Sequence, residues 1–575
     1  MIGDLRLPLP QRRGPRTPPA ATIDPRRYES LGELLRDALV QFKTSTALVE
    51  MTRKRESARY TYLDFHREAM RVAAWLEREG VSPGDRVAIL MGNQPRWLIG
   101  AYAALYRGAI LVPLDYKLTA AEQAALVAHA RPKALLVEEG LARRFGPGAL
   151  QVPSTLVSER WDELPAPDAP PAFVPRARTD TATIVYSSGT AGRPKGCMLS
   201  HDSYLEQLRG LVEMFPIVQG DRYFSVLPTN HAIDFMVGFV GPMCGGAAVI
   251  HQRTLRPEFV RWTMQSQRIT HMAVVPLLLE AFERSIDEKL DAQPPMVRGF
   301  VEALSAFNEA LTQSRPRHAL SRRLLGPVHD GFGGALSMLF CGGAFVDRAR
   351  AERFYRLGIP VVIGYGLTEA CTVVTVNDLE PFRADSVGKP VSGVEVRIAD
   401  PDAAGIGEVL VRGRTLMQGY LDDPELTAET IRDGWLHTGD LGWVDASGHL
   451  HLVGRAKNMI VTAGGKNVYP EDVEAAFDGV DCEELAVVAS NYVWREERPD
   501  EGRLLIVARP RKDGDRAALA RALRERNRNQ SDYKRASGLV LWEHEMPRTA
   551  SMKLKREALA EELRTAVARE AVEAL

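Results

Sequence analysis

Short β-rich runs alternate with amphipathic helical windows along the first two thirds of the chain. The run RVAIL at 86–90 precedes a helical window at 95–108, and the run AILVPL at 109–114 precedes a second window at 119–130. A third run, KALLVEE at 133–139, completes a βαβαβ unit. Strands separated by helices predict parallel sheets covered by helices, so we expect an α/β fold of stacked mixed sheets.

The pattern changes after Asp385, where short apolar runs punctuated by glycine predict a smaller, antiparallel β-barrel-like region. The segment 456–575 mixes strand-like runs such as LAVVAS with helical windows such as AALARALRERNRN, which predicts a small α+β domain. We therefore expect a flexible lead-in at 1–30, a large domain at 31–455 and, across a hinge, the small domain at 456–575.

Composition and charge indicate a globular protein of several domains. The 575 residues are too many for one core, and 45% of them are hydrophobic. The net charge of −1 favours no nucleic acid partner. Five distant cysteines without a CxxC pair argue against a disulfide framework or a zinc site. The longest apolar stretch, 235–250, contains four glycines and a proline, so we expect no transmembrane segment and a cytoplasmic location.

A loop rich in glycine and hydroxyl groups follows the strand-like run at 181–186. It reads YSSGTAGRPKG at 186–196, and it departs from the pattern GxxxxGK[ST] because Pro194 stands at the second glycine position. Its backbone N–H groups, hydroxyls and lysine suit an anion, so we interpret it as a phosphate-binding loop. The alternative is a polar surface loop without a ligand. The residues expected to contact the anion are Ser187, Ser188, Gly189, Thr190, Gly192 and Lys195.

Seven motifs, taken in order, resemble the adenylate-forming superfamily, which includes acyl-CoA synthetases, adenylation domains of peptide synthetases and luciferases. The motifs are YSSGTAGRPKG at 186–196, LPTNHAIDF at 227–235, CGGAF at 341–345, GYGLTEA at 364–370, GWLHTGDLG at 434–442, GRAKNMIVTAGGKNVYPEDVE at 454–474 and PRTASMKLKR at 547–556. The resemblance implies that ATP converts a carboxylic acid to an acyl-adenylate with release of pyrophosphate, and that a thiol then captures the acyl group. It assigns the loop at 186–196 to the phosphates that leave as pyrophosphate.

The resemblance also implies domain roles and cofactors. Residues 31–455 would bind AMP and the acyl group, and residues 456–575 would rotate between the two half-reactions. The implied cofactors are ATP, Mg²⁺ and coenzyme A. The implied partner is a small carboxylic acid, and a carrier-protein thiol or another nucleophile is the alternative acceptor to coenzyme A. A non-catalytic sensor of nucleotide or acyl group is a third possibility that the intact motifs disfavour.

Four catalytic residues are implied by the same resemblance. Lys553 would bridge the substrate carboxylate and the α-phosphate, and Thr368 would lie near that phosphate. Glu369 and the hydroxyl of Thr190 would hold Mg²⁺, which prefers oxygen ligands. His231 would lie at the passage for the acyl group and the thiol. A solvated basic run around Lys553 and a packed structural histidine are the alternatives.

The nucleotide contacts follow from the remaining motifs. Tyr365 would offer an aromatic face to adenine, Asp440 would accept hydrogen bonds from both ribose hydroxyls, and Arg455 would reach the ribose and phosphates. Core packing, a turn cap and a surface arginine are the respective alternatives. Further expected positions are Gly342, Gly343, Ala344, Gly364, Gly366, Gly464, Gly465 and Lys466. Phe345 and Met552 depart from the family pattern, which leaves the local shape of the acyl pocket and the reach of Lys553 open.

The 60 residues at 276–335 separate two strand-like runs and contain helical windows. This insertion resembles the long-chain fatty acyl-CoA synthetase branch, so we predict an acid–thiol ligase for a long-chain fatty acid. Medium-chain, aryl and polyketide-like acids stay open. Seven Lys and Arg residues lie in the insertion, and we favour a solvated helical face over a peripheral membrane contact.

Overall fold

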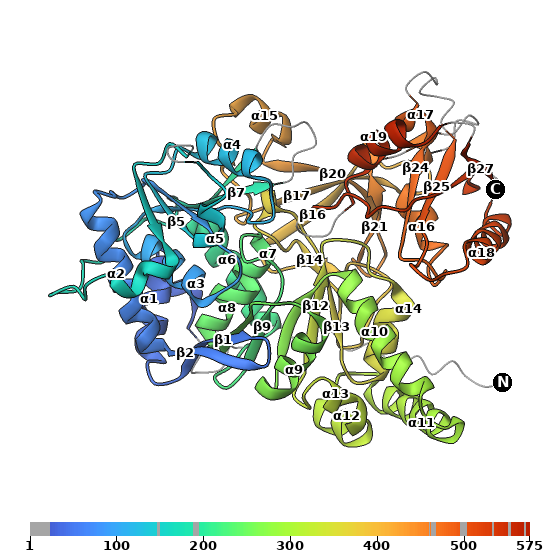
Figure 1. Cartoon of the computed structure of the whole chain (residues 1–575), viewed down its shortest axis with the longest axis horizontal. Helices are drawn as coiled ribbons and strands as arrows, with labels where there is room; N and C mark the ends of the chain where they lie inside the picture. Colours follow the sequence, from blue (N-terminus) through green and yellow to red (C-terminus); the bar gives the residue numbers. More distant parts are fainter. Residues whose placement is uncertain are drawn as a thin grey trace.

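The structure is a computed structural model with a large part and a small part. Figure 1 shows the large part in blue to yellow at the left and centre, and the small part in orange to red at the upper right. The described residues are 23–146, 150–187, 195–458, 460–461, 467–494, 503–531, 534–549, 554–568 and 571–575.

A nine-stranded mixed sheet forms the middle of the large part. Its strands from β13 to β1 are parallel, and antiparallel strands flank them at both edges. In sheet order they are β15 (Lys389–Pro390), β14 (Thr375–Val376), β13 (Val361–Tyr365), β12 (Met338–Gly342), β11 (His271–Val274), β9 (Arg222–Ser225), β10 (Ala248–Gln252), β1 (Thr46–Thr52) and β2 (Arg55–Thr61).

A seven-stranded sheet contains the predicted βαβαβ unit, which the structure confirms. In sheet order its strands are β18 (Gly419–Tyr420), β8 (Lys195–Ser200), β7 (Thr181–Ser187), β4 (Ile110–Pro113), β3 (Arg86–Leu90), β5 (Ala134–Val137) and β6 (Ser154–Val157). Strands β3, β4 and β5 are parallel, and helices α3 (Pro95–Tyr106) and α4 (Ala120–Ala130) connect them. Their carboxyl ends therefore face the same edge, where α/β folds bind ligands.

One apolar core joins these two sheets. It contains Leu48 of β1, Ile89 of β3 and Val185 of β7, together with residues of the helices between the sheets. Those helices are α1 (Leu31–Gln41), α2 (Tyr62–Arg78), α3, α6 (His201–Met214), α7 (Ala232–Phe235) and α8 (Gly241–Gly245), with a π-helix at Met236–Val240. Helix α2 begins at a capping box in which the Thr61 hydroxyl accepts from the Asp64 N–H, and the Asp64 carboxylate accepts from the Thr61 N–H.

The end of the predicted flexible lead-in is packed onto the large part, which corrects that expectation for residues 23–30. Ile23 is 5% exposed, and its backbone N–H donates to the Cys244 carbonyl oxygen at 2.9 Å. A 3-10 turn at Pro25–Arg27 follows. The sequence around Ile23 is rich in proline and arginine, and its buried apolar side chains, Ile23 and Pro25, give no periodic signal. Residues 1–22 lie outside the described residues.

The predicted antiparallel region after Asp385 is confirmed as a five-stranded sheet. Its strands are β16 (Val394–Ala399), β17 (Gly407–Gly413), β20 (Trp435–Val444), β19 (Ile431–Arg432) and β21 (Leu450–Arg455), which pairs with β20. Helix α15 (Pro424–Thr430) precedes β19.

The small part is an α+β unit, as the sequence predicts. Its four-stranded sheet is β24 (Glu484–Ala489), β25 (Leu504–Arg509), β26 (Gly538–Leu541) and β27 (Glu573–Ala574), and its helices include α16 (Pro470–Ala475), α17 (Ser490–Val493), α18 (Arg516–Arg528) and α19 (Arg556–Ala566). A two-stranded ribbon, β22 (Ile460–Val461) and β23 (Asn467–Val468), precedes them. Arg350 of the large part lies 3.7 Å from the Asp478 carboxylate. A domain boundary at residue 455 stays a prediction.

Helices follow β11 through the predicted insertion. They are α10 (Pro276–Asp291), α11 (Pro295–Thr312), α12 (His318–Leu324) and α13 (Gly326–Gly331). Helix α14 (Arg348–Arg356) lies between β12 and β13, and α9 (Pro257–Gln267) lies between β10 and β11. Among the described residues, no helix combines the length and the apolar character needed to cross a bilayer.

Candidate active site

The predicted phosphate-binding loop lies between the antiparallel strands β7 and β8. Ser187 at the end of β7 pairs with Lys195 at the start of β8, so the two ends of the loop lie side by side. A Cβ on Gly196 would lie 2.9 Å from Ile184, so this position needs glycine or a shift of its neighbour. The Lys195 ammonium lies 5.7 Å from the ring centroid of Tyr420. The hairpin therefore fixes where the loop begins and ends, beside Tyr420.

Several predicted site residues lie outside the described residues. They are Ser188, Gly189, Thr190, Gly192, Gly464, Gly465, Lys466 and Lys553, together with Met552. Their roles stay predictions.

Glu369 lies in a 3-10 turn, Thr368–Ala370, directly after β13. The Tyr420 hydroxyl donates to Glu369 Oε1 at 3.0 Å, and the Met417 N–H donates to the Glu369 carbonyl oxygen at 2.8 Å. Burial and the Glu369 charge raise the pKa of Tyr420, so its hydroxyl stays a donor. Since Tyr420 lies beside both Lys195 and Glu369, it brings the start of β8, where the predicted phosphate-binding loop ends, close to this carboxylate.

The donor set around Glu369 fits a magnesium ion shared with phosphates. Mg²⁺ is usually held by one or two carboxylates plus substrate phosphate oxygens. Glu369 is partly exposed, and Tyr420 uses one of its oxygens. In the part of the chain that the structure describes, no group of three or more acidic, His or Cys side chains is placed to hold a metal by itself. The arrangement thus suits a metal that arrives with a nucleotide.

Asp440 is a second carboxylate near the end of β13. Two side chains, Arg455 and Tyr365, bind it. It is 6% exposed, and its β20 position pairs with Arg455 of β21. Arg455 Nε lies 2.8 Å from Asp440 Oδ1, and the Tyr365 hydroxyl donates to Asp440 Oδ2 at 2.7 Å. Burial and the Asp440 charge raise the pKa of Tyr365, so this hydroxyl also stays a donor. Because a carboxylate has about four acceptor sites, Asp440 can still accept from ligand hydroxyls.

Three glycines lie in or directly after strands β12 and β13, next to Tyr365. Gly342 of β12 pairs with Gly364 of β13, and a Cβ on Gly342 would lie 2.7 Å from the Gly364 carbonyl oxygen. A Cβ on Gly366 would lie 1.6 Å from the Thr372 carbonyl oxygen, so this turn excludes a side chain. At Gly342 and Gly366 a side chain would thus collide with the protein's own backbone, so the local packing of the chain requires glycine.

The segment after Gly342 turns outward. Gly343 has a positive φ of 84°, which favours glycine, and Ala344 is exposed. Phe345, which departs from the family pattern, is 63% exposed. Its ring therefore lies on the surface of this segment.

His231 lies between loops that follow the carboxyl ends of both large sheets. It precedes α7 as its N-cap residue, and its Nε2 atom is 3.9 Å from Asp115 Oδ2 in the loop after β4. Asn93, in the loop after β3, accepts from the Thr229 N–H at 3.0 Å and donates to Ser225 Oγ at 3.0 Å. These bonds place His231 at the junction of the two sheets.

The buried carboxylate of Asp234 stabilises the loop that precedes α7. Asp234 is fully buried and accepts hydrogen bonds from Ser225 Oγ at 2.7 Å, Thr229 Oγ1 at 2.9 Å and the Tyr223 hydroxyl at 3.1 Å. Burial raises the pKa of Asp234 to about 6, although the three hydroxyl donors oppose this shift. The sequence motifs do not point to Asp234, Asn93 or Tyr420. Asn93 and Tyr420 act through contacts between distant segments, and the burial of Asp234 among nearby hydroxyls follows no motif.

The described residues on either side of 550–553 contact other parts of the small part. Arg548 forms an isolated β-bridge with Leu554, and the partly buried Arg556 lies 2.6 Å from Glu474 of α16. The Lys555 charge contributes to the lowered pKa of Glu122, whose largest cause is a hydrogen bond from the Thr119 backbone. Lys555 therefore lies on the side of the small part that faces the start of α4.

The start of α4 belongs to the surroundings of His231. The Gln123 side chain of α4 donates to the Asp115 carbonyl oxygen at 3.0 Å, and Asp115 faces His231. The small part thus approaches the large part on the side of the candidate site.

A cavity of about 520 Å³ lies elsewhere in the large part. Its lining includes Thr46 at the start of β1, Arg222 at the start of β9 and Ala248 at the start of β10. The residues described above follow the carboxyl ends of the strands, which is where open α/β sheets bind ligands. We therefore assign the candidate site to the carboxyl edge and not to this cavity.

Comparison with known proteins agrees with this geometry. The model of the AMP-binding enzyme family matches residues 35–421. The chain is 31% identical over 425 residues to a feruloyl-CoA synthase of an Amycolatopsis species, covering 72% of this chain and 77% of that protein. It is 31% identical over 435 residues to a long-chain-fatty-acid–CoA ligase of Mycobacterium tuberculosis, covering 69% of each. A substituted propanoyl:CoA ligase of the same organism is 31% identical over 553 residues, or 91% of this chain and 97% of that protein.

Solved structures share the fold. The o-succinylbenzoate coenzyme A synthetase of Bacillus subtilis in complex with ATP and magnesium ion superposes with a TM-score of 0.72 at 21% identity, over 92% of this chain and 99% of that one. ATP-bound MatB of Rhodopseudomonas palustris gives 0.74 at 24% identity, over 93% and 99%. The chain therefore belongs to the AMP-binding enzyme family, in its AMP-forming acyl-CoA synthetase group of acid–thiol ligases.

Proposed function

We propose that this ligase activates a long-chain fatty acid through an acyl-adenylate and transfers the acyl group to coenzyme A. The observation that carries the chemistry is that the end of β13 and the turn after it position two carboxylates, Asp440 and Glu369. Tyr365 holds Asp440, and four residues later Glu369 is held by Tyr420 beside Lys195. One carboxylate suits a ribose and the other suits a metal bound to phosphates.

In the first half-reaction, an oxygen of the substrate carboxylate attacks the α-phosphorus of ATP and the bond to the pyrophosphate oxygen breaks. Asp440 and Arg455 would hold the ribose, while Ser187, Lys195 and the loop between them would hold the leaving phosphates. Mg²⁺ bound by Glu369 and Thr190 would supply positive charge at the phosphate oxygens. Lys553 would neutralise the repulsion between the two reacting anions.

In the second half-reaction, the thiol sulfur attacks the acyl carbonyl carbon and the bond to AMP breaks. We place His231 beside the reacting acyl group, and we assign the thiol passage to Gly464, Gly465 and Lys466. The domain at 456–575 would turn about its hinge between the two steps. Its ion pair with the large part, Arg350 to Asp478 at 3.7 Å, is partly exposed, and such pairs are weak, which suits a reversible docking.

The choice of acid rests on the insertion and on the relatives. Helices α10 to α13 form the insertion that resembles the long-chain branch, and a long-chain-fatty-acid–CoA ligase is among the relatives at 31% identity. The test is AMP release with ATP, Mg²⁺ and coenzyme A across saturated acids of increasing chain length and ferulate. We expect kcat/KM to be highest for acids of about 12 to 18 carbons. A higher value for ferulate would overturn the choice of acid and leave the ligase reaction intact.

The acceptor is tested in the same assay. We expect coenzyme A to be consumed in step with AMP release. If acyl-AMP accumulates in the presence of coenzyme A and a holo-carrier protein relieves this, transfer to a carrier-protein thiol replaces the proposal.

The role of Lys553 is tested against its neighbour Lys555. Lys553→Ala should lower adenylate formation by about 100-fold or more, because an ammonium between two anions is lost. Thioester formation from supplied acyl-adenylate should fall less than about tenfold. Lys555→Ala is the matched control and should leave both steps near wild type. Equal loss in both steps with Lys553→Ala would contradict the assignment.

A further inference from the structure

An ion pair joins the two large sheets at their carboxyl edge. Arg253 follows β10 of the nine-stranded sheet, and its backbone N–H donates to the Met51 carbonyl oxygen at 3.0 Å. Glu138 follows β5 of the seven-stranded sheet, and its backbone N–H donates to the Leu90 carbonyl oxygen at 3.1 Å. Between them, Arg253 Nη2 donates to Glu138 Oε1. The pair therefore connects the end of one sheet to the end of the other.

Arg253 also compensates the charge of Glu50 in β1. Its Nε atom lies 3.6 Å from Glu50 Oε1. The side chains of Arg253, Glu50 and Glu138 are 27%, 21% and 19% exposed, so water reaches these charges only in part. Removal of the arginine would leave two carboxylates close together without their cation, which costs more than the loss of an exposed ion pair.

The same two side chains bind the loop after β3. Arg253 Nη1 donates to the Asn93 carbonyl oxygen at 3.2 Å. Glu138 Oε2 accepts from the Gly92 N–H at 3.0 Å and from the Gln94 side-chain amide at 3.2 Å. One ion pair thus binds three consecutive residues of this loop.

Asn93 links the ion pair to the loop that precedes α7. Its side-chain amide donates to Ser225 Oγ at 3.0 Å and to the Leu227 carbonyl oxygen at 2.5 Å. Its Oδ1 atom accepts from the N–H of Thr229, which is 1% exposed. Because one side chain makes all three bonds, the position of Asn93 sets the position of the loop that carries His231.

We propose that Arg253 and Glu138 are positioning residues for the ligase reaction. The pair holds Asn93, and Asn93 holds the loop that places His231 at the passage for the acyl group and the thiol. This inference rests on the role proposed for His231. None of the seven motifs contains Arg253, Glu138 or Asn93, so the sequence alone does not point to them.

The alternative is that the pair stabilises the fold without affecting the site. A loss of stability lowers the amount of folded enzyme, so it lowers the apparent kcat and leaves every KM unchanged. A displaced His231 loop instead weakens the binding of the acid and the thiol. ATP, which we assign to Asp440 and the phosphate-binding loop, would bind as before. The two roles therefore differ in the constants that change.

The first test is steady-state kinetics of Arg253→Gln, below the melting temperature of the variant. We expect KM for the acid and for coenzyme A to rise about tenfold, while KM for ATP changes by less than about twofold. Arg253→Lys should recover part of this loss. It keeps the charge, but a single ammonium cannot reproduce the fork that reaches Glu138, Glu50 and the Asn93 carbonyl oxygen.

Asn93→Ala is a second variant, which leaves the ion pair intact. It should raise the same two KM values, and it tests the inference even if Arg253→Gln does not fold. The double variant should be little worse than Asn93→Ala alone, because both changes act along one chain of contacts. Fully additive effects of the two changes would overturn the inference.

Arg209 of α6 provides a matched control elsewhere in the large part. It is also partly buried between two carboxylates, with Nε 3.0 Å from Glu206 and Nη1 3.5 Å from Glu213. Its Nη1 donates to Ser392 Oγ at 2.9 Å. Arg209→Gln should leave KM for the acid, coenzyme A and ATP unchanged.

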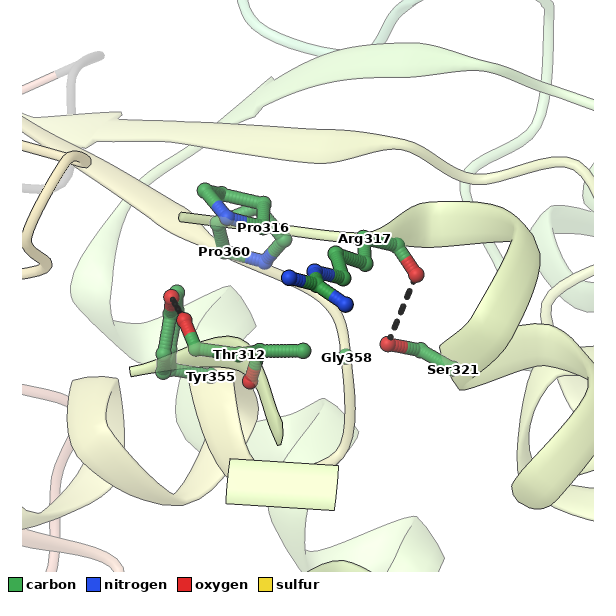
Figure 2. A pocket seen from close by; sticks show the side chains of 7 residues that line it. All are labelled: Thr312, Pro316, Arg317, Ser321, Tyr355, Gly358 and Pro360. Atoms are coloured by element: carbon green, nitrogen blue, oxygen red, sulfur yellow. Dashed lines mark hydrogen bonds between the residues drawn. The ribbon is translucent and has the colours of Figure 1, made fainter. Parts of the chain in front are cut away.

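Tyr355 provides a control for a loss of stability alone. Figure 2 shows its hydroxyl bonded to the Thr312 carbonyl oxygen, in a pocket that it shares with Ser321, and this bond is 2.5 Å long. Tyr355→Phe removes this buried hydrogen bond far from the His231 loop in the contact network. It should lower the melting temperature and leave all three KM values unchanged.

Hydrogen exchange tests the position of the loop without relying on turnover. In Arg253→Gln and in Asn93→Ala, amide exchange in peptides covering 226–235 should be at least about tenfold faster than in wild type, because the bonds that hold this segment are lost. Unchanged exchange there, or unchanged KM for both the acid and coenzyme A, would overturn the inference. If wild type activates no acid, the proposed function fails, and the exchange measurement still decides whether the pair positions the loop.

Discussion

Two carboxylates at one edge of the large part are held in different ways. Asp440 is 6% exposed and bound by both Arg455 and Tyr365, at 2.8 and 2.7 Å. Glu369 is partly exposed and bound by the Tyr420 hydroxyl at 3.0 Å, and among the described residues no lysine or arginine forms an ion pair with it. This difference in charge compensation indicates different roles for Asp440 and Glu369. Asp440 has its charge compensated by the protein, whereas Glu369 keeps a negative charge that a cation from outside can meet.

The comparison predicts different kinetic consequences for the two positions. A group that binds substrate and transition state equally changes KM, whereas a group that acts on developing charge changes kcat. We assign the first behaviour to Asp440 and the second to Glu369. A change in kcat alone for Asp440 variants, or in KM alone for Glu369 variants, would contradict this assignment.

The largest effect is expected at Glu369. Glu369→Gln removes the charge that would hold Mg²⁺ at the phosphates, so pyrophosphate release should fall by about 100-fold or more at saturating ATP. Single-turnover measurement of adenylate formation checks this. Glu425→Gln, an exposed glutamate at the start of α15, is the matched control and should keep wild-type turnover. Retention of more than half of the activity by Glu369→Gln would refute the metal assignment.

A smaller effect is expected at Asp440. Asp440→Asn keeps the size of the side chain but weakens acceptance of hydroxyl hydrogen bonds and leaves Arg455 without its charge partner. We expect KM for ATP to rise about tenfold, which corresponds to about 1.4 kcal/mol, with a smaller change in kcat. Steady-state kinetics with varied ATP test this, and an unchanged KM would count against a ribose contact.

The hydroxyls of Tyr420 and Tyr365 allow the roles of Glu369 and Asp440 to be tested separately. Tyr420→Phe should raise the Mg²⁺ concentration needed for half-maximal activity a few-fold, because Glu369 loses its orienting donor. Tyr365→Phe should instead raise KM for ATP a few-fold through Asp440. Each variant is the control for the other, since both delete one buried hydroxyl. If both variants change the same constant, the two carboxylates share one task.

The smallest effect on turnover is expected at Asp234, a third carboxylate, which accepts hydrogen bonds from three hydroxyls. Its pKa is raised to about 6 from an ordinary value of 3.8, so the folded state binds the proton more tightly than the unfolded state. This contribution to stability is complete below about pH 4 and is lost as the pH rises to about 6. Two pKa units correspond to about 3 kcal/mol.

Asp234→Asn should therefore be more favourable at high pH. The melting temperature of the variant minus that of wild type should be higher at pH 7.5 than at pH 4.5, because asparagine carries no charge to bury. Thermal unfolding followed by circular dichroism at both values measures this difference. A difference that is the same at both values would show that Asp234 titrates normally.

Much of the fold was predictable from local pattern. The run at 86–90 and the window at 95–108 became β3 and α3, because alternation of buried strands with helices is a strong local signal. The antiparallel region after Asp385 and the α+β character of the small part were equally legible. These predictions depend on neighbours in sequence, which is why they held.

Other features depend on distant contacts and left no local signal. Tyr420 reaches Glu369 because β18 pairs with β8, and that pairing joins segments more than 200 residues apart. Arg556 stands in a basic run that looks solvated, yet it is partly buried and paired with Glu474 of α16 at 2.6 Å. The periodicity of α11 shows two sides but does not say which one faces inward, and here Asn308 and Ser321 decided it.

Pyrophosphate release from ATP that depends on an added acid is the direct test of acyl-adenylate formation by this enzyme. With Mg²⁺, ATP and a long-chain fatty acid but without a thiol, the account predicts pyrophosphate and an enzyme-bound acyl-AMP in equal amounts. Addition of coenzyme A should then convert this acyl-AMP to acyl-CoA and free AMP. Pyrophosphate release that does not depend on any added acid, or no release with any acid, would contradict the account.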